Sequence, residues 1–129
     1  MPKLSFGTAN SLEPMNEQQL ISRIKSREAV IGIIGMGYVG LPLALAASQP
    51  GFRVIGFDIS CERVRQLNQG ASPLKHIRKE ILAKRLQQKL FEATGDFSRL
   101  QDVDAIIICV PTPLKNHREP DLSFIFQTE

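Results

Sequence analysis

The sequence is poor in residues that mark several common classes of protein. It has two cysteines, one tyrosine and no tryptophan in 129 residues. Two cysteines are too few for a disulfide framework and neither forms a C-x-x-C pair, so we expect reduced thiols in a cytoplasmic protein. Nucleic-acid interfaces interleave aromatic residues with a basic patch. Their scarcity here argues against a nucleic-acid partner, despite a net charge of +3.

Metal-binding and targeting signals are also lacking. The two histidines, His76 and His117, have no spacing to each other or to a cysteine that suggests a metal site. The N-terminus has no apolar core behind a basic segment, so no signal peptide is expected. With 43% hydrophobic and 22% charged residues, the composition is that of one ordinary globular domain.

One long stretch lacks charge altogether. Residues 29–52, AVIGIIGMGYVGLPLALAASQPGF, are long enough for a membrane span. However, they contain five glycines and two prolines, and they change halfway from β-branched to helix-forming residues. This pattern favours a strand, a turn and a helix over a membrane span.

The glycines of this stretch have a recognisable spacing. Gly35-x-Gly37-x-x-Gly40 lies between an expected strand, 29–34, and an expected helix, 41–47. In that context the pattern predicts a dinucleotide-binding turn. The first glycine permits a tight turn, the second lets the backbone approach a pyrophosphate, and the third lets the helix pack on the sheet. The helix N-terminus then directs free N–H groups at the phosphates.

An acidic residue follows at a suitable distance. A second expected strand, 53–57, ends at Asp58, eighteen residues beyond Gly40. A carboxylate there is placed to bind the adenosine ribose and to repel a 2′-phosphate, which predicts NAD rather than NADP. The alternative is a loop acid or a cap for the expected helix 61–68. Arg63, in that helix, either lines the adenosine pocket or is a solvated charge, and the sequence leaves both open.

The rest of the chain continues the α/β pattern. We expect an amphipathic helix over 17–25 capped by Asn16, a second over 78–90, a short strand over 91–94, a helical turn over 97–100 and a buried strand over 104–110. The basic residues of 78–90 fit a polyanion partner or a solvated face, and the solvated face is favoured. The fold class predicted is α/β: a Rossmann-type doubly wound parallel sheet, incomplete, with about four strands.

Five segments together resemble a known family: IGIIGMGYVGLPLALA, GFDIS, LNQGASPLKHI, DFSRLQDVDAIIICVPTPL and REPDLSFI. In this order and spacing they resemble the N-terminal NAD-binding domain of the nucleotide-sugar 6-dehydrogenases. The branch that acts on UDP-N-acetylhexosamines is the most similar. The resemblance covers about residues 17–129. It implies an N-terminal segment over 1–28 that contains a short amphipathic helix, followed by a truncated NAD-binding domain over 29–129.

The resemblance implies an activity and a set of cofactor contacts. The family oxidises the C6 alcohol of a UDP-sugar, here a UDP-N-acetylhexosamine or UDP-glucose, to the uronate in two NAD-dependent steps. Position by position, it implies that Asp58 binds the adenosine ribose, Arg63 lies beside the adenosine, and Thr112 lies near the nicotinamide half. The pyrophosphate would be held by Gly35, Gly37, Tyr38, Val39 and Gly40.

The resemblance also implies what these residues do not supply. It places the family's catalytic cysteine, lysine and asparagine in a later domain, so no catalytic residue is expected within residues 1–129. We therefore expect an NAD-binding portion that is inactive alone, with UDP-sugar binding and homo-oligomerisation belonging to the full-length protein. The alternative is a catalytically silent NAD-binding sensor or interaction module. A sheet without its neighbouring strands should also have an open edge and uncovered apolar surface.

Overall fold

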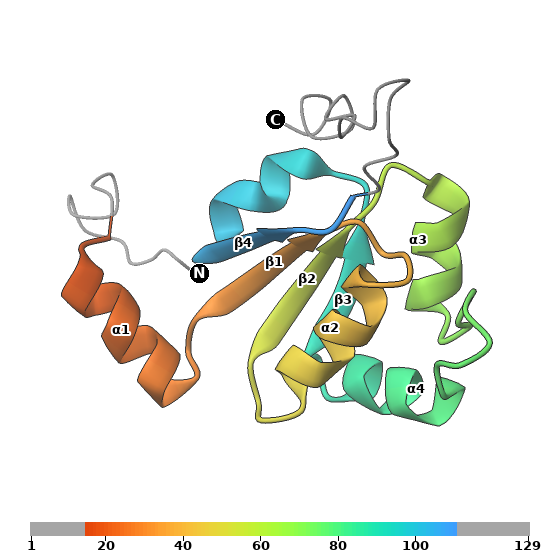
Figure 1. Ribbon diagram of the computed structural model, residues 1–129, viewed down its shortest axis with the longest axis horizontal. Helices are drawn as coiled ribbons and strands as arrows, with labels where there is room; N and C mark the ends of the chain where they lie inside the picture. Colours follow the sequence, from red (N-terminus) through yellow and green to blue (C-terminus); the bar gives the residue numbers. More distant parts are fainter. Residues whose placement is uncertain (1–14, 111–129) are drawn as a thin grey trace, which may run out of the picture.

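The structure, a computed structural model, describes residues 15–110. Within this range four strands form one parallel sheet in the order β3-β2-β1-β4 (Figure 1). The elements follow the chain as α1 (Glu17–Ser26), β1 (Val30–Ile34), α2 (Gly40–Ser48), β2 (Arg53–Phe57), α3 (Cys61–Asn68), α4 (Lys79–Gln87), β3 (Phe91–Thr94), the 3₁₀ helix η2 (Phe97–Asp102) and β4 (Ala105–Ile108). The predicted α/β fold class with about four parallel strands is confirmed.

Local signals in the sequence explain where the helices begin. Asn16 caps α1, because its side chain accepts a hydrogen bond from the Gln19 N–H at 2.8 Å and the Gln19 side chain accepts one from the Asn16 N–H at 3.0 Å. Ser60 caps α3 by accepting from the Arg63 N–H at 3.1 Å. These two side chains satisfy backbone donors that the helices themselves leave free.

One helix is shorter than the sequence predicted. The apolar spacing suggested a helix over 78–90, whereas α4 ends at Gln87. Lys89 adopts the left-handed conformation, with φ of 60°, and the Leu90 N–H turns back to the Arg85 carbonyl at 3.0 Å. The Leu90 carbonyl then accepts from the Val54 N–H at 2.8 Å. Leu90 therefore leads into the sheet rather than extending the helix.

Alternate residues of the strands fill two cores on opposite faces of the sheet. Helices α2, α3 and α4 cover one face, where Ile33, Val54 and Phe91 are buried (Figure 1). The other face buries Ile34, Ile55 and Phe57, and the partly buried Phe97 and Leu100 of η2 pack against them. Cover on both faces of β1 and β2 explains why these two strands read as continuous apolar runs.

The order of the strands reverses beside β1. The chain moves from β1 to β2 to β3 in one direction, then returns through η2 to place β4 on the other side of β1. In open α/β sheets, ligands bind at the carboxyl ends of the strands where the order reverses. Gly35 and Cys109 follow β1 and β4 at this point, and the Cys109 N–H donates to the Ile34 carbonyl at 2.7 Å.

Helix α1 is attached at the opposite end of the strands. It buries none of its own residues. Arg23 forms an ion pair with the buried carboxylate of Asp104 at 2.9 Å, and the same oxygen accepts from the Val30 N–H at 2.8 Å. Figure 1 shows α1 beside the sheet, away from the glycine turn. No described helix is long and apolar enough to cross a membrane.

The two edges of the sheet differ in how far they are covered by described residues. On β3, the Asn68 side chain donates to the Ala93 carbonyl at 2.8 Å and accepts from the Ala93 N–H at 2.9 Å. A helix side chain thus takes the place of a neighbouring strand. On β4, which is the other edge in the part of the chain described, exposed isoleucines follow one another: Ile106, Ile107 and Ile108. Among residues 15–110, β4 is therefore the open edge, and the prediction of a buried strand over 104–110 was wrong for these isoleucines.

Replacing Asn68 by alanine is expected to destabilise the domain by about 1–3 kcal/mol, because both polar groups of Ala93 lose their partner. Urea unfolding followed by circular dichroism measures the change. Arg65→Ala in the same helix is the matched control, since the Arg65–Glu62 pair is exposed and should contribute well under about 1 kcal/mol. Equal stability of the two variants would contradict this role for Asn68.

Candidate cofactor site

Two glycines of the turn after β1 are required by the backbone of the chain itself. Gly35 has φ of 100°, and a Cβ there would lie 2.7 Å from the Cys109 carbonyl oxygen. At Gly40, a Cβ would collide with the Gly35 carbonyl oxygen. The first residue of α2 therefore packs directly against the turn. This geometry agrees with the tight turn and the close packing expected at these two positions.

The middle glycine has a different environment. A Cβ on Gly37 would meet a single atom within 4 Å, Nη1 of the flexible Arg63 side chain, at 3.8 Å. Its backbone is not in the left-handed region. Folding of the described residues therefore does not explain why this position lacks a side chain. The space above Gly37 is open, as it must be if a ligand approaches the backbone there.

The start of α2 presents free hydrogen-bond donors. The backbone N–H groups of residues 37–40 have no acceptor within residues 15–110, and no side chain caps the helix. Pro42, in the first turn, contributes no N–H at all. Free donors combined with the positive end of the helix dipole favour an anion such as a phosphate.

The Asp58 carboxylate connects β2 to the glycine turn. Its Oδ2 accepts from the Met36 N–H and its Oδ1 accepts from the Ser60 N–H, each at 2.9 Å. The side chain is 11% exposed. Each carboxylate oxygen has a further lone pair, so the group is fixed in position and can still accept hydrogen bonds from a ligand. Of the alternatives left open by the sequence, capping of α3 is performed by Ser60 rather than by Asp58.

Arg63 lies beside Asp58. Its Nη1 is 3.9 Å from the Asp58 Oδ2, and its side chain is 38% exposed. The guanidinium donates no side-chain hydrogen bond to any described residue. It borders a hollow in the surface.

These groups surround one hollow at the carboxyl ends of the strands. Its walls come from the ends of β1, β2 and β4 and from the start of α3, and they include Ile34, Gly35, Met36, Gly37, Phe57, Asp58, Ile59, Arg63, Cys109 and Val110. Burial raises the pKa of the Cys109 thiol, which favours its protonated form. Within the described residues no group of three or more His, Cys, Asp or Glu side chains is placed to hold a metal ion.

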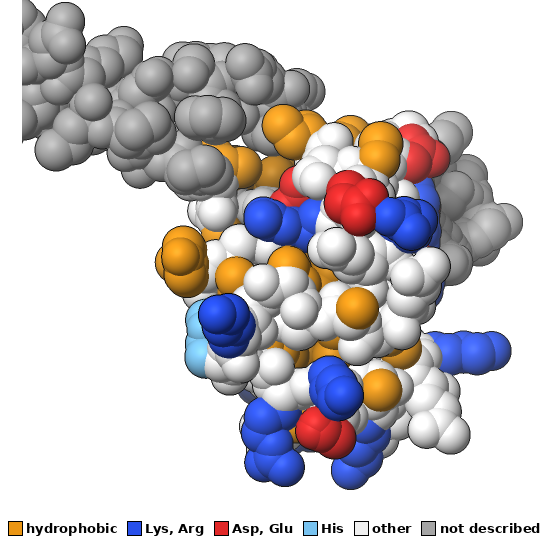
Figure 2. All heavy atoms as spheres, turned by 90° about the vertical axis from the view of Figure 1, so that its right-hand side faces the viewer, with side chains coloured by type: hydrophobic (Ala, Val, Ile, Leu, Met, Phe, Trp, Pro, Cys, Tyr) orange, Lys and Arg blue, Asp and Glu red, His pale blue; other side chains and the backbone are white. Residues whose placement is uncertain are grey.

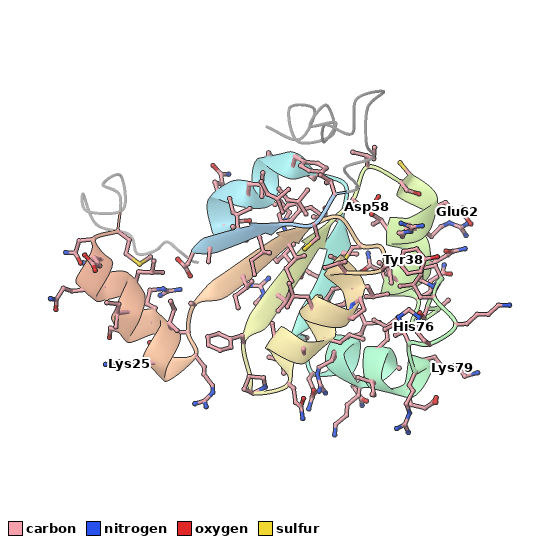
Figure 3. All side chains as sticks on the ribbon, in the orientation of Figure 1. Lys25, Tyr38, Asp58, Glu62, His76 and Lys79 are labelled. Carbon is pink, nitrogen blue, oxygen red and sulfur yellow. The ribbon has the colours of Figure 1, made fainter. Side chains whose placement is uncertain are left out.

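Not every residue predicted for the site lines the hollow. Gly35, Gly37, Asp58 and Arg63 do. Tyr38 and Val39 are 80% and 64% exposed, and neither they nor Gly40 line the hollow. Figure 3 shows Tyr38 beside the N-terminal end of α2, with Asp58 above it near the end of β2. Thr112 lies outside the described residues.

Met36 was missed by reasoning from the sequence. Its N–H donates to Asp58, and its fully buried side chain packs over β2, where a Cβ at Gly56 would collide with its sulfur. Met36 thus anchors the turn to the sheet from both backbone and side chain. The glycine inside the strand RVIGF was the available signal, because glycine within a strand often marks a close approach.

The basic segment before and within α4 lies away from this hollow. Figure 2 shows Lys and Arg side chains gathered over the lower part of the face formed by α3 and α4. Arg78, Lys79, Lys84 and Lys89 are exposed, and none forms an ion pair with a described residue. Arg85 differs from them, because it is partly buried and donates to the Ser48 hydroxyl at 3.0 Å. These exposed charges agree with the solvated face favoured by the sequence.

Comparison with known proteins decides the family. The profile of the NAD-binding domain of the UDP-glucose/GDP-mannose dehydrogenase family matches residues 29–129. The chain belongs to this family. The match confirms the resemblance drawn from the five sequence segments, and it agrees with NAD as the predicted cofactor of the domain.

Individual relatives agree with the family match. UDP-N-acetyl-D-glucosamine 6-dehydrogenase of Salmonella typhi is 33% identical over 96 residues, which are 74% of this chain and 22% of the relative. GDP-mannose 6-dehydrogenase of Pseudomonas aeruginosa is 38% identical over 97 residues, again 74% and 22%. The chain therefore spans less than a quarter of the length of these relatives.

Solved structures show the same fold. A crystal structure of a ternary complex of GDP-mannose dehydrogenase from Pseudomonas aeruginosa superposes with a TM-score of 0.71 at 36% identity. The superposition covers 75% of the 129-residue chain and 23% of the Pseudomonas aeruginosa chain. The parallel sheet and its flanking helices thus correspond to part of a larger dehydrogenase.

Proposed function

We propose that this family member binds NAD in the hollow between the glycine turn and Asp58. It would form the NAD-binding portion of a UDP-sugar 6-dehydrogenase. The observation that carries the proposal is the open space over Gly37, beside four backbone N–H groups that have no acceptor among residues 15–110. Neither feature is required for folding of the described residues, and both suit a pyrophosphate.

The pyrophosphate, ribose and adenosine of NAD would each contact a different group of the site. The pyrophosphate would accept hydrogen bonds from the N–H groups at the start of α2. The ribose hydroxyls would donate to the free lone pairs of Asp58, and Arg63 would lie beside the adenosine. When bound, NAD supplies the hydride acceptor for oxidation of an alcohol. The residues of the chain would position NAD, and the N–H groups at the start of α2 would stabilise the negative charge of its pyrophosphate.

The substrate proposed is a UDP-N-acetylhexosamine or UDP-glucose, oxidised at C6 to the uronate. Support comes from the sequence resemblance and from the Salmonella relative, which is named for UDP-N-acetyl-D-glucosamine. The resemblance places the catalytic cysteine outside residues 1–129. We therefore expect the 129-residue chain to bind NAD without oxidising a UDP-sugar.

Calorimetric titration of the purified chain with NAD tests the binding proposal. We expect saturable heat with NAD and a weaker response to NADP, because the Asp58 carboxylate repels a 2′-phosphate. Circular dichroism first establishes that the sample is folded. A folded chain that gives no heat with NAD would refute the proposal.

Replacing Asp58 by alanine should weaken NAD binding by about 1–3 kcal/mol, because the ribose hydroxyls lose their charged acceptor. The same substitution removes the acceptors of the Met36 and Ser60 N–H groups, so its thermal unfolding is measured beside the titration. Asp102→Ala is the control, since Asp102 is an exposed acid on η2, away from the hollow. NAD affinity unchanged in a folded Asp58→Ala variant would exclude the ribose contact.

A further inference from the structure

We propose that Met36 is a positioning residue, and that its buried side chain and Gly56 form a size-matched pair that sets the height of the glycine turn above β2. The pair would fix the free N–H groups of the turn relative to the Asp58 carboxylate. The inference rests on the proposed function, because these two groups would hold two parts of the same dinucleotide.

The Met36 side chain fills the space that a side chain on Gly56 would need. Met36 is fully buried, and a Cβ on Gly56 would overlap its Sδ and lie 3.1 Å from its Cε and 3.2 Å from its Cγ. The backbone of Gly56 is not in the left-handed region, so its conformation does not require glycine. Its partners on the neighbouring strands, Ile33 and Ala93, belong to the same core cluster as Met36. The gap left at Gly56 is therefore occupied by a side chain from the turn.

The backbone of the turn is attached to β2 at the two positions that follow. The Gly35 N–H donates to the Phe57 carbonyl at 2.7 Å, and the Met36 N–H donates to the Asp58 Oδ2 at 2.9 Å. Three consecutive positions at the end of β2 thus contact the turn. Of these contacts, the one at Gly56 is the one that depends on the size of a side chain.

The free donors of the site begin at the residue after Met36. The N–H groups of residues 37–40 have no acceptor among residues 15–110. Because the chain is continuous, raising Met36 away from β2 would also move these N–H groups and weaken the hydrogen bond to Asp58. A ligand that contacts both groups needs them at a fixed separation, which a locked side chain beside the site provides.

NAD affinity measured by calorimetric titration in four chains is the first test: the unchanged chain, Gly56→Ala, Met36→Ala and the double variant. Gly56→Ala should weaken binding by about tenfold, the effect of losing one hydrogen bond to a charged group. Added to Met36→Ala, the same substitution should weaken binding no further, because its methyl group enters the space that the methionine has left. A general need for glycine in β2 would not give this dependence.

A second measurement needs no cofactor. Hydrogen exchange of the residue 36 amide, followed by NMR, reports its hydrogen bond to Asp58. Relative to the amides of β1, exchange should be about tenfold faster in Gly56→Ala, if one hydrogen bond is lost. Leu82→Ala is the matched control, because Leu82 is fully buried in the same core cluster and does not line the hollow. It should lower stability but change neither NAD affinity nor this exchange ratio.

The outcomes separate this inference from the proposed function. Failure of the unchanged, folded chain to bind NAD would refute the function, while the exchange measurement would still test the positioning. A folded Gly56→Ala variant that keeps the NAD affinity or the exchange ratio of the unchanged chain would refute the inference alone. An equal loss of affinity with and without the Met36 side chain would also overturn it.

The double variant decides the case in which Gly56→Ala does not fold. Folding restored by adding Met36→Ala would support the size match, because the second substitution removes the atoms with which the new methyl group collides. A double variant that stays unfolded, although Met36→Ala alone folds, would contradict it.

Discussion

Replacing Gly40 by alanine is expected to destabilise the domain by about 3 kcal/mol or more, since a new methyl group would meet a backbone atom that cannot rotate away. The added Cβ would overlap the Gly35 carbonyl oxygen, and it would also contact the Cβ of Cys109 at 3.4 Å. Relief requires α2 to move away from β1 and β2, which it helps to cover. Chemical denaturation followed by far-UV circular dichroism measures the loss.

The matched control for this prediction is Gly37→Ala, three residues earlier in the same turn. Its Cβ would meet only the flexible end of Arg63. We expect Gly37→Ala to unfold at nearly the same denaturant concentration as the unchanged chain. Equal stability of the Gly40→Ala and Gly37→Ala variants would contradict the close packing of α2 on the glycine turn.

The Gly37→Ala variant is expected to lose NAD affinity by about tenfold or more, although its fold is intact. The new methyl group would occupy the space through which the pyrophosphate approaches the backbone, and it would lengthen the hydrogen bonds to the free N–H groups. Calorimetric titration measures the affinity, and denaturation of the same sample measures the stability. Substitution of Gly37 should change NAD affinity without changing stability, because a Cβ there would contact only the flexible end of Arg63.

A second glycine provides the control for the binding measurement. Gly95 follows β3 and does not line the hollow, and a Cβ there would make an ordinary contact with the Asp58 carbonyl at 3.5 Å. Gly95→Ala should therefore bind NAD like the unchanged chain. If Gly37→Ala also bound NAD with unchanged affinity, the pyrophosphate could not lie against this turn.

Much of the fold could be predicted because the local signals agree with the packing. The β-branched runs before Gly35 and before Asp58 become strands β1 and β2, and capping residues mark where α1 and α3 begin. The glycine spacing placed a sharp turn between β1 and α2, which the Gly35 and Gly40 geometry explains. In these segments short-range preferences and burial favour the same structure.

Other features depend on contacts between residues far apart in sequence. The 78–90 spacing suggested a longer helix, and nothing local showed that Leu90 would instead pair its carbonyl with Val54 of β2. Asn68 reads as an ordinary residue near a helix end, yet its side chain completes the edge of β3. Neither assignment is possible until the sheet order is known.

The candidate site was only partly predictable for the same reason. Asp58 could be identified by its distance from the glycines, but its hydrogen bond to the Met36 N–H depends on how the turn folds back over β2. The side-chain direction of Arg63 was open between pocket and solvent until α3 was placed beside the turn. Cys109, which packs against the core beside β1, also lines the hollow, and its position there depends on the pairing of β4 with β1.

The central claim is that the glycine turn and Asp58 together hold a dinucleotide. The most direct measurement is a titration of the isotopically labelled 129-residue chain with NAD, followed by the NMR signals of its assigned backbone amides. We predict that the amide signals of residues 35–40 and 58–63 shift and saturate together, while those of α1 and α4 stay in place. Saturation with shifts confined to α1 or α4, or no shift in a folded sample at millimolar NAD, would contradict the account.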